Sequence, residues 1–133
     1  MKILFLDDDE NRHKRFRQRM TSKPFSPALT AEGAIEILED HPFKEIVFNI
    51  VSLDHDLCGG VFEPSDEKSG AEVARYIAVM DNPPQKVVLH SYNEKGVAEM
   101  AAILWGAECK IVVAPFDTEA YWKQFEVKDE THN

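Results

Sequence analysis

The chain has 133 residues, of which 44% are hydrophobic and 29% are charged, and its formal net charge is −9. This length fits one domain, and the composition is ordinary for a globular protein. No apolar run approaches the roughly 18 residues of a membrane helix, and the negative charge disfavours bulk nucleic-acid binding. We expect a cytoplasmic protein without membrane contact, with a single domain over residues 1–126 and a polar tail at 127–133.

The first part of the chain alternates short apolar runs with helical patterns. Residues 2–6 are apolar and end in acidic residues, which is typical of a buried strand. Residues 11–20 predict a helix, because two large apolar side chains lie four positions apart on one face. A very short strand is expected at residues 28–29. Thr30 is suited to cap a second helix that reaches Asp40.

The middle of the chain contains its longest β-type run. Residues 45–53 are almost continuously apolar and rich in β-branched types, which predicts a strand covered on both faces, as in a parallel sheet. Glycine, proline and acidic residues at 58–68 predict a loop, which could close over a site as a lid. Ser69 and Glu72 have capping-box spacing and predict a helix up to about Met80.

The last part repeats the alternation. Residues 86–90 predict a strand, and Ser91-x-x-Glu94 again has capping-box spacing ahead of an amphipathic helix. Residues 110–113 predict the final strand, and Asp117 or Thr118 can cap the final helix. Five β-α units with short connections predict an α/β fold whose parallel sheet carries helices on both faces.

Polar residues follow the first, third and fourth predicted strands. Ligands of open parallel sheets bind outside the carboxyl ends of the strands, so these residues should share one rim. They are Asp7, Asp8, Asp9, Asp54, His55, Asp56, His90, Ser91 and Asn93. Clustered carboxylates repel one another, and a few hard oxygen ligands with room for water suit Mg²⁺. We therefore expect a site for Mg²⁺, or for Mn²⁺, next to a phosphate group.

The other polar residues of the rim allow more than one interpretation. His55 and His90 could act as general acid and base, because imidazole titrates near neutral pH. Ser91 and Asn93 suit helix capping, and the helix N-terminus that they would cap is itself an anion site. The basic stretch at 12–19 fits either a solvated helix face or a rim that attracts phosphate.

This arrangement resembles the receiver domain of response regulators over nearly the whole chain. An acidic cluster follows the first strand, Asp54 stands at the phosphoacceptor position, and Ser91 follows the fourth strand. The resemblance implies a flavodoxin-like three-layer sandwich with a five-stranded parallel sheet of order 2-1-3-4-5. Receivers usually carry Lys-Pro-Phe after the fifth strand, where this chain has Ala114, Pro115 and Phe116. The missing lysine argues against ordinary phosphorelay signalling.

Three motifs together are more similar to a receiver-derived group named for predicted cyclic-phosphate processing. They are LDDDxxR at 6–12, LDHDL at 53–57 and HSxN at 90–93. This resemblance implies a metal-dependent, phosphoesterase-like site that acts on a cyclic phosphate of a small molecule, a nucleotide or an RNA end. It implies metal ligation by Asp8, Asp9, Asp54 and Asp56, catalysis by Asp54, His55 and His90, and phosphate contacts from Arg12, Ser91 and Asn93.

Two other functions stay open at this stage. Asp54 could accept a phosphoryl group, as in a signalling receiver. Alternatively, the same rim could bind a nucleotide or a protein partner without turnover, as a pseudo-receiver.

Overall fold

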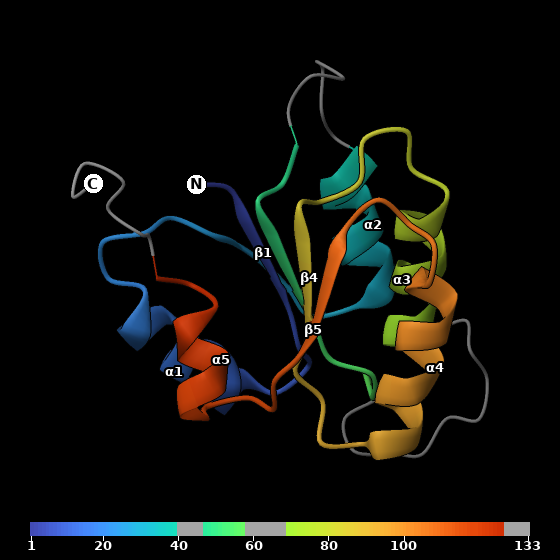
Figure 1. The fold of residues 1–133 in the computed structure, drawn as a ribbon. Coiled ribbons are helices and arrows are strands. Elements are labelled where there is room, and N and C mark those ends of the chain that lie inside the picture. The colour runs from blue at the N-terminus through green and yellow to red at the C-terminus, as the bar shows by residue number, and fades with distance from the viewer. Residues whose placement is uncertain (40–46, 58–68, 127–133) are drawn as a thin grey trace, which may run out of the picture.

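The computed structural model describes residues 1–39, 47–57 and 69–126, in which five short strands form one parallel sheet with helices on both faces (Figure 1). The strands are β1 (Ile3–Leu6), β2 (Ser26–Ala28), β3 (Ile50–Leu53), β4 (Lys86–Leu89) and β5 (Lys110–Val113). The helices are α1 (Glu10–Arg19), α2 (Ala31–Glu39), α3 (Gly70–Ala78), α4 (Glu94–Leu104) and α5 (Glu119–Lys123). The predicted lid at 58–68 and the predicted tail at 127–133 lie outside the described residues.

The sheet has the order β2-β1-β3-β4-β5, and all neighbouring strands are parallel. The order 2-1-3-4-5 and the α/β class expected from the sequence are therefore confirmed. In the register, Leu6 pairs with Leu53, and Leu53 pairs with Leu89. The segments that follow β1, β3 and β4 consequently begin side by side at one edge of the sheet.

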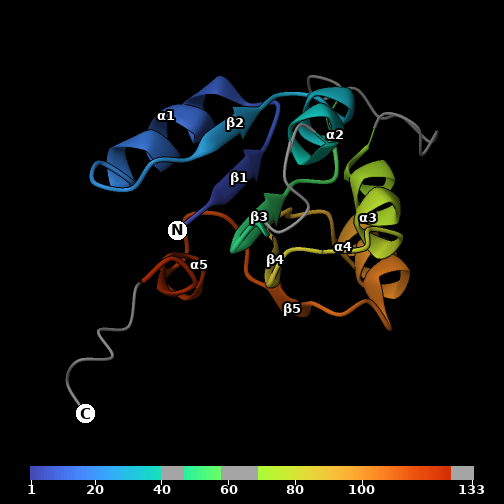
Figure 2. The ribbon, with the colours of Figure 1, turned by 90° about the horizontal axis from the view of Figure 1, so that it is seen from above.

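Each face of the sheet has its own hydrophobic core. Leu4 and Leu6 face the core under α2, α3 and α4, whereas Ile3 and Phe5 face the core under α1 and α5. This division follows from the alternation of side chains along a strand. Figure 2 shows the two layers, with α1 and α5 on one side of the strands and α2, α3 and α4 on the other. None of the described helices is long and apolar enough to cross a membrane.

Three local features differ from the sequence-based expectation, the first being β2, which spans Ser26–Ala28 rather than residues 28–29. Within the described residues, β3 begins at Ile50 rather than in the mid-forties. The backbone N–H groups of Asn49 and Ile50 both donate to the Lys2 carbonyl, and the Asn49 side chain accepts the Lys2 N–H, so the ladder with β1 starts only after this contact. The N-cap of α4 is Asn93 and not Ser91, because the Asn93 side chain accepts the Gly96 N–H.

Candidate functional site

A cavity of about 430 Å³ opens at the carboxyl edge of the sheet. It is lined by residues of the segments that follow β1, β3 and β4, namely Asp8, Asp9, Arg12, Asp54, Asp56, Ser91, Tyr92 and Asn93. The fold therefore gathers in one pocket six of the nine side chains that the sequence placed at this rim, while Asp7, His55 and His90 do not line it. The two predicted catalytic histidines, His55 and His90, are not among the lining residues.

Asp9 and Arg12 are positioned by the start of α1. Asp9 is the N-cap, and its Oδ1 accepts the backbone N–H groups of Asn11 at 2.8 Å and Arg12 at 3.1 Å. The Arg12 guanidinium, one turn further on, places Nη1 at 3.3 Å from Oδ2 of Asp7 and at 3.6 Å from Oδ2 of Asp54. A fixed positive charge thus stands between two buried carboxyl groups.

Arg12 is the member of the basic stretch 12–19 that lines this pocket. His13 is buried, and its Nε2 lies 2.6 Å from the backbone oxygen of Asp7. Arg15 forms an ion pair with Asp117 at 3.2 Å, outside the pocket. If the basic stretch attracts phosphate into this cavity, it does so through Arg12.

Asp7 lies in a buried network rather than in the pocket. Its side chain has no exposed surface, and its Oδ1 accepts the Asp9 N–H at 2.9 Å while Oδ2 lies 2.9 Å from Nε2 of His90. Burial raises the pKa of Asp7, but the hydrogen bonds from His90 and from the Asp9 N–H, together with the charge of Arg12, outweigh burial and leave the pKa below its usual value. Asp7 is therefore an ionised group that orients Arg12.

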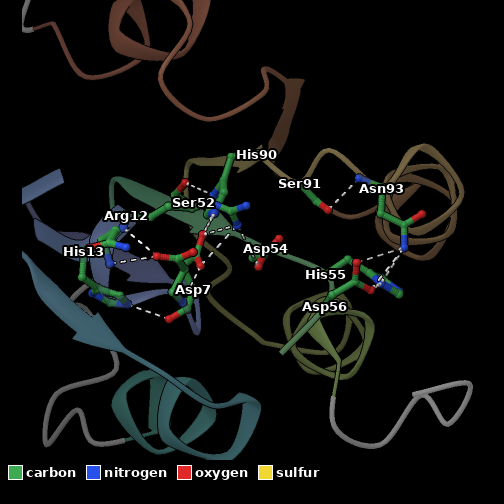
Figure 3. A network of polar contacts seen from close by, with 12 residues as sticks. Asp7, Arg12, His13, Ser52, Asp54, His55, Asp56, His90, Ser91 and Asn93 are labelled. Carbon is green, nitrogen blue, oxygen red and sulfur yellow. Dashed lines mark hydrogen bonds and ion pairs between the residues drawn. The ribbon is translucent and has the colours of Figure 1, made fainter. Parts of the chain in front are cut away.

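His90 is completely buried. Its ring lies next to Asp7, to which a dashed line joins it in Figure 3. Its Nδ1 lies 2.7 Å from Oγ of Ser52, which lies 2.7 Å from the Tyr121 hydroxyl. Burial lowers the pKa of His90 more than Asp7 raises it, so the ring is neutral. Because an ionised carboxylate only accepts hydrogen bonds, Nε2 of His90 donates to Asp7, Nδ1 accepts from Ser52, and Ser52 accepts from Tyr121.

His55 does not line the pocket, and its ring is held by two carboxylates. Its Nδ1 lies 2.9 Å from Oδ1 of Asp56, and its Nε2 lies 2.9 Å from Oε1 of Glu99 on α4. Burial lowers the pKa of His55, but the hydrogen bonds to Asp56 and Glu99 prevail and raise it. A ring that donates from both nitrogens is an imidazolium and has no lone pair with which to accept a proton. Asn93 donates to the same Asp56 at 3.2 and 3.3 Å.

Asp54 is the buried carboxyl group that lines the pocket directly after β3. Burial and the negative charge of Asp7 raise its pKa from 3.8 to about 7, although Arg12 acts in the opposite direction. Arg12 therefore compensates the two buried carboxylates only in part. A further positive charge in the cavity would stabilise the ionised form of Asp54.

The donor set of the pocket fits a hard divalent cation. Asp8, Asp9, Asp54 and Asp56 present carboxylates to one cavity, and oxygen ligands with room for water suit Mg²⁺. A second grouping, of Asp7, Asp54 and His90, has one ligand atom from each residue within 4.8 Å of the others. We favour the pocket set, because Asp7 and His90 are buried and already bonded to each other.

Several residues of this site carry no obvious signal in the sequence. Ser52 is a single hydroxyl inside an apolar strand, and that interruption is the one clue to its buried network. Tyr121 and Glu99 come from helices distant in sequence, and their contacts with Ser52 and His55 depend on helix docking. Tyr92 could have been noticed from its place between two predicted phosphate contacts.

Several known structures similar to this chain are receiver domains. The response regulator TrrA from Thermotoga maritima, solved in complex with Mg²⁺-BeF, is 20% identical, with 92% of this chain and 94% of that chain covered and a TM-score of 0.63. A CheY-like receiver domain protein from Methanospirillum hungatei JF-1 is 16% identical, with 92% and 88% covered and a TM-score of 0.64. At these identities the likeness shows the fold alone.

No curated protein matches the chain. A family described as "Cyclic-phosphate processing Receiver domain" matches residues 2–105, which include every residue that lines the pocket. This match covers well over half of the sequence. The sheet order and the similarity to receiver structures agree with it. The chain belongs to the cyclic-phosphate processing receiver domain family.

Proposed function

We propose that this protein binds a phosphate ester together with a divalent cation and hydrolyses a cyclic phosphate. The observation that supports the proposal is the composition of one cavity, in which carboxylates stand beside the guanidinium of Arg12 and the polar side chains of Ser91 and Asn93. Carboxylates suit a cation, and Arg12 matches the geometry of a phosphate. The ligand would be a phosphate-containing small molecule, a nucleotide or an RNA end, met in the cytoplasm.

Asp8, Asp9 and Asp54 would hold Mg²⁺ or Mn²⁺, with Asp56 at the same cavity as a further carboxylate. When bound, such an ion supplies positive charge that polarises a phosphoryl oxygen. The Arg12 guanidinium is prepositioned for a phosphate oxygen, because Asp7 and the N-cap of α1 fix it before any ligand enters. Preorganised charge of this kind is the main way in which a protein stabilises phosphoryl transfer.

The segment between β4 and α4 would provide the remaining contacts. Oγ of Ser91 accepts the Asn93 N–H at 3.0 Å, which orients the hydroxyl beside the first turn of α4. The N-terminus of an α-helix attracts anions through its unpaired N–H groups and its dipole. Asn93 caps that helix through Oδ1 and donates from Nδ2 to Asp56, so a phosphate contact from Asn93 would replace its contact with Asp56.

Hydrolysis of a cyclic phosphodiester adds one water molecule. The water oxygen bonds to phosphorus, one ring P–O bond breaks, and a proton of the water ends on the leaving oxygen. The assignment of His55 and His90 as acid and base stays a prediction that no observation tests. Both nitrogens of each ring already have protein partners, which disfavours this role. The geometry supports a different part for His90, namely to position Asp7 and, through Asp7, Arg12.

The direct test incubates purified protein with Mg²⁺ or Mn²⁺ and a broad panel of cyclic phosphodiesters, and follows release of the ring-opened monoester. We expect turnover that is lost on chelation and strongly reduced in Asp54→Asn and Arg12→Gln. Glu119→Gln, an exposed change on α5, is the control and should keep the activity. Absence of product across the whole panel would contradict hydrolysis and leave metal-dependent binding.

A second candidate is phosphoryl acceptance by Asp54. It is favoured by the position of this buried carboxyl group directly after β3, in a fold shared with a receiver solved with Mg²⁺-BeF. Beryllofluoride and Mg²⁺ would be added, and a stable adduct on Asp54 would be sought by NMR. An adduct without any turnover of cyclic phosphates would favour this second candidate.

A further inference from the structure

Tyr92 is a large aromatic residue in an unusual place. It lies between Ser91 and Asn93, lines the acidic cavity and is 62% exposed. Other large apolar side chains are exposed in the described parts of the chain, such as Trp105 at 86%, but they do not line this cavity. An exposed aromatic ring that lines a cavity offers its apolar face to any ligand that enters there.

The ring of Tyr92 is fixed although it is exposed. Its hydroxyl donates to the backbone oxygen of Phe116 at 2.6 Å, which ties the tip of the ring to the segment after β5. Its backbone is fixed on both sides, since Ser91 accepts the Asn93 N–H and Asn93 caps α4. A ligand that stacked on this ring would therefore restrict little additional motion of the protein.

The cavity has room for more than a phosphate group. Its volume of about 430 Å³ lies within the range of roughly 300–1,000 Å³ found for pockets that bind whole small molecules. Arg12 and the aspartates provide for a charged phosphate with its cation, whereas Tyr92 offers a planar apolar surface in the same cavity. A ligand that uses both features has a phosphate at one end and a flat ring at the other.

We propose that Tyr92 is a stacking platform for a nucleobase, so that the ligand of this site is a nucleoside phosphate rather than the phosphate of a sugar or polyol. The inference rests on the proposed function and specifies its substrate class. Aromatic side chains bind bases through stacking, which tolerates any base because every base has a π-face. Purine and pyrimidine nucleotides should therefore both bind.

The test compares phosphate ligands with and without a base. In the presence of Mg²⁺, calorimetry would give the affinity for inorganic phosphate, for a ribose phosphate, and for the adenosine and cytidine monophosphates. We expect both nucleotides to bind roughly 5- to 150-fold more tightly than the ribose phosphate, as the usual strength of base stacking implies. A short oligoribonucleotide with a terminal cyclic phosphate and the free cyclic nucleotide would be measured side by side, to distinguish an RNA end from a free nucleotide. Tighter binding of either one than of the ribose phosphate supports the inference.

Variants of Tyr92 then locate the effect. Tyr92→Phe keeps the ring and should keep the preference for nucleotides, whereas Tyr92→Leu keeps bulk without an aromatic face and should bind nucleotide and ribose phosphate equally. Trp105→Leu, an exposed aromatic change outside the cavity, is the matched control and should retain the preference. Equal binding of ribose phosphate and nucleotides by the unmodified protein, or a preference that survives Tyr92→Leu, would overturn the inference while the proposed function stands. Failure of every phosphate compound to bind would overturn both.

Discussion

Asp54 has an ionisable group in a place where ionisation is costly. It is 3% exposed, close to the ionised Asp7, and only partly compensated by Arg12. A carboxyl group under these conditions keeps its proton to a higher pH than usual. The protonation of Asp54 therefore changes both the stability of the metal-free protein and the charge of its pocket.

This link predicts a pH dependence of stability. Because the pKa of Asp54 rises from 3.8 to about 7 on folding, the folded state binds more protons than the unfolded state between these values. The contribution of Asp54 to the free energy of unfolding is full below its pKa in the unfolded state. It is lost as the pH rises through its pKa in the folded state, at about 1.4 kcal/mol per pH unit. The test is urea unfolding in EDTA. Between pH 5 and pH 8, the free energy of unfolding of the native protein should fall by about 3 kcal/mol relative to that of Asp54→Asn.

The comparison with Asp54→Asn is needed because the histidines titrate in the same range. The lowered pKa of His90 adds stability that is lost as the pH falls below 6.5, while the raised pKa of His55 adds stability that is lost as the pH rises above 6.5. Both effects persist in the variant and cancel in the difference. Glu119→Gln serves as the charge control, and a difference that does not change with pH would contradict the environment described for Asp54.

The buried hydrogen-bonded chain makes a second prediction. Ser52→Ala removes the partner of both His90 and Tyr121 and should cost about 1–3 kcal/mol, whereas Tyr121→Phe should cost about 1 kcal/mol. The double variant should cost less than the sum, since the groups act as one network. Urea unfolding of the four proteins measures this coupling. Tyr76→Phe, outside the network, should stay within about 0.5 kcal/mol, and strictly additive losses would contradict the chain.

At the scale of single residues, the sequence could predict which side chains reach the rim but not which way each one turns. Asp8, Asp9 and Asp54 were predicted correctly to share one edge, because strand ends determine that edge. The buried position of His90 was not predictable, because it depends on Ser52 and Tyr121 meeting behind the strand.

At the scale of elements, two glycines let helices approach the site closely. Gly70 begins α3 and Gly96 lies in the first turn of α4. A Cβ atom at Gly70 would overlap the backbone carbonyl of Asp54, and one at Gly96 would overlap the ring of His55. The helices on one face of the sheet can therefore contact the site residues only because these two positions lack a side chain.

These contacts reverse the usual effect of replacing glycine by alanine in a helix. Elsewhere the change stabilises by about 1 kcal/mol, but Gly70→Ala should destabilise by about 1–3 kcal/mol or more, because the Asp54 backbone must shift. Gly96→Ala should cost less, since the His55 side chain can move, but it should separate His55 from Glu99. Gly33→Ala in α2 is the comparison, where the nearest atom is a movable side-chain oxygen. Urea unfolding that ranked Gly70→Ala as the mildest change would contradict this packing.

Element types were predictable because the periodicities of strands and helices differ, whereas the ends were less so. The spacing Ser91-x-x-Glu94 imitates a capping box, but α4 is capped by Asn93. Both residues have side chains that can cap, and the choice depends on where the chain leaves β4. Helix ends are uncertain by one or two residues, so spacing alone does not decide between two capping residues that lie two positions apart.

At the scale of the molecule, the parallel sheet converts three distant segments into one acidic pocket in a chain of net charge −9. The order β2-β1-β3-β4-β5 puts β1, β3 and β4 next to one another, so their carboxyl ends supply the aspartates and the N-terminus of α4 together. Repulsion among these aspartates disfavours the empty pocket, and a bound cation would relieve it. In the proposed function, the binding of phosphate esters would therefore depend on a bound cation.

The most direct measurement is a calorimetric titration of Mg²⁺ into the metal-free protein at pH 8, where Asp54 is largely ionised. We predict saturable binding, with an affinity at least about tenfold weaker in Asp8→Asn and Asp54→Asn, a loss of about 1.4 kcal/mol or more. Glu119→Gln on α5 should bind as the native protein does. Absence of saturable binding, or equal binding by Asp54→Asn and the native protein, would contradict a cation site in this pocket.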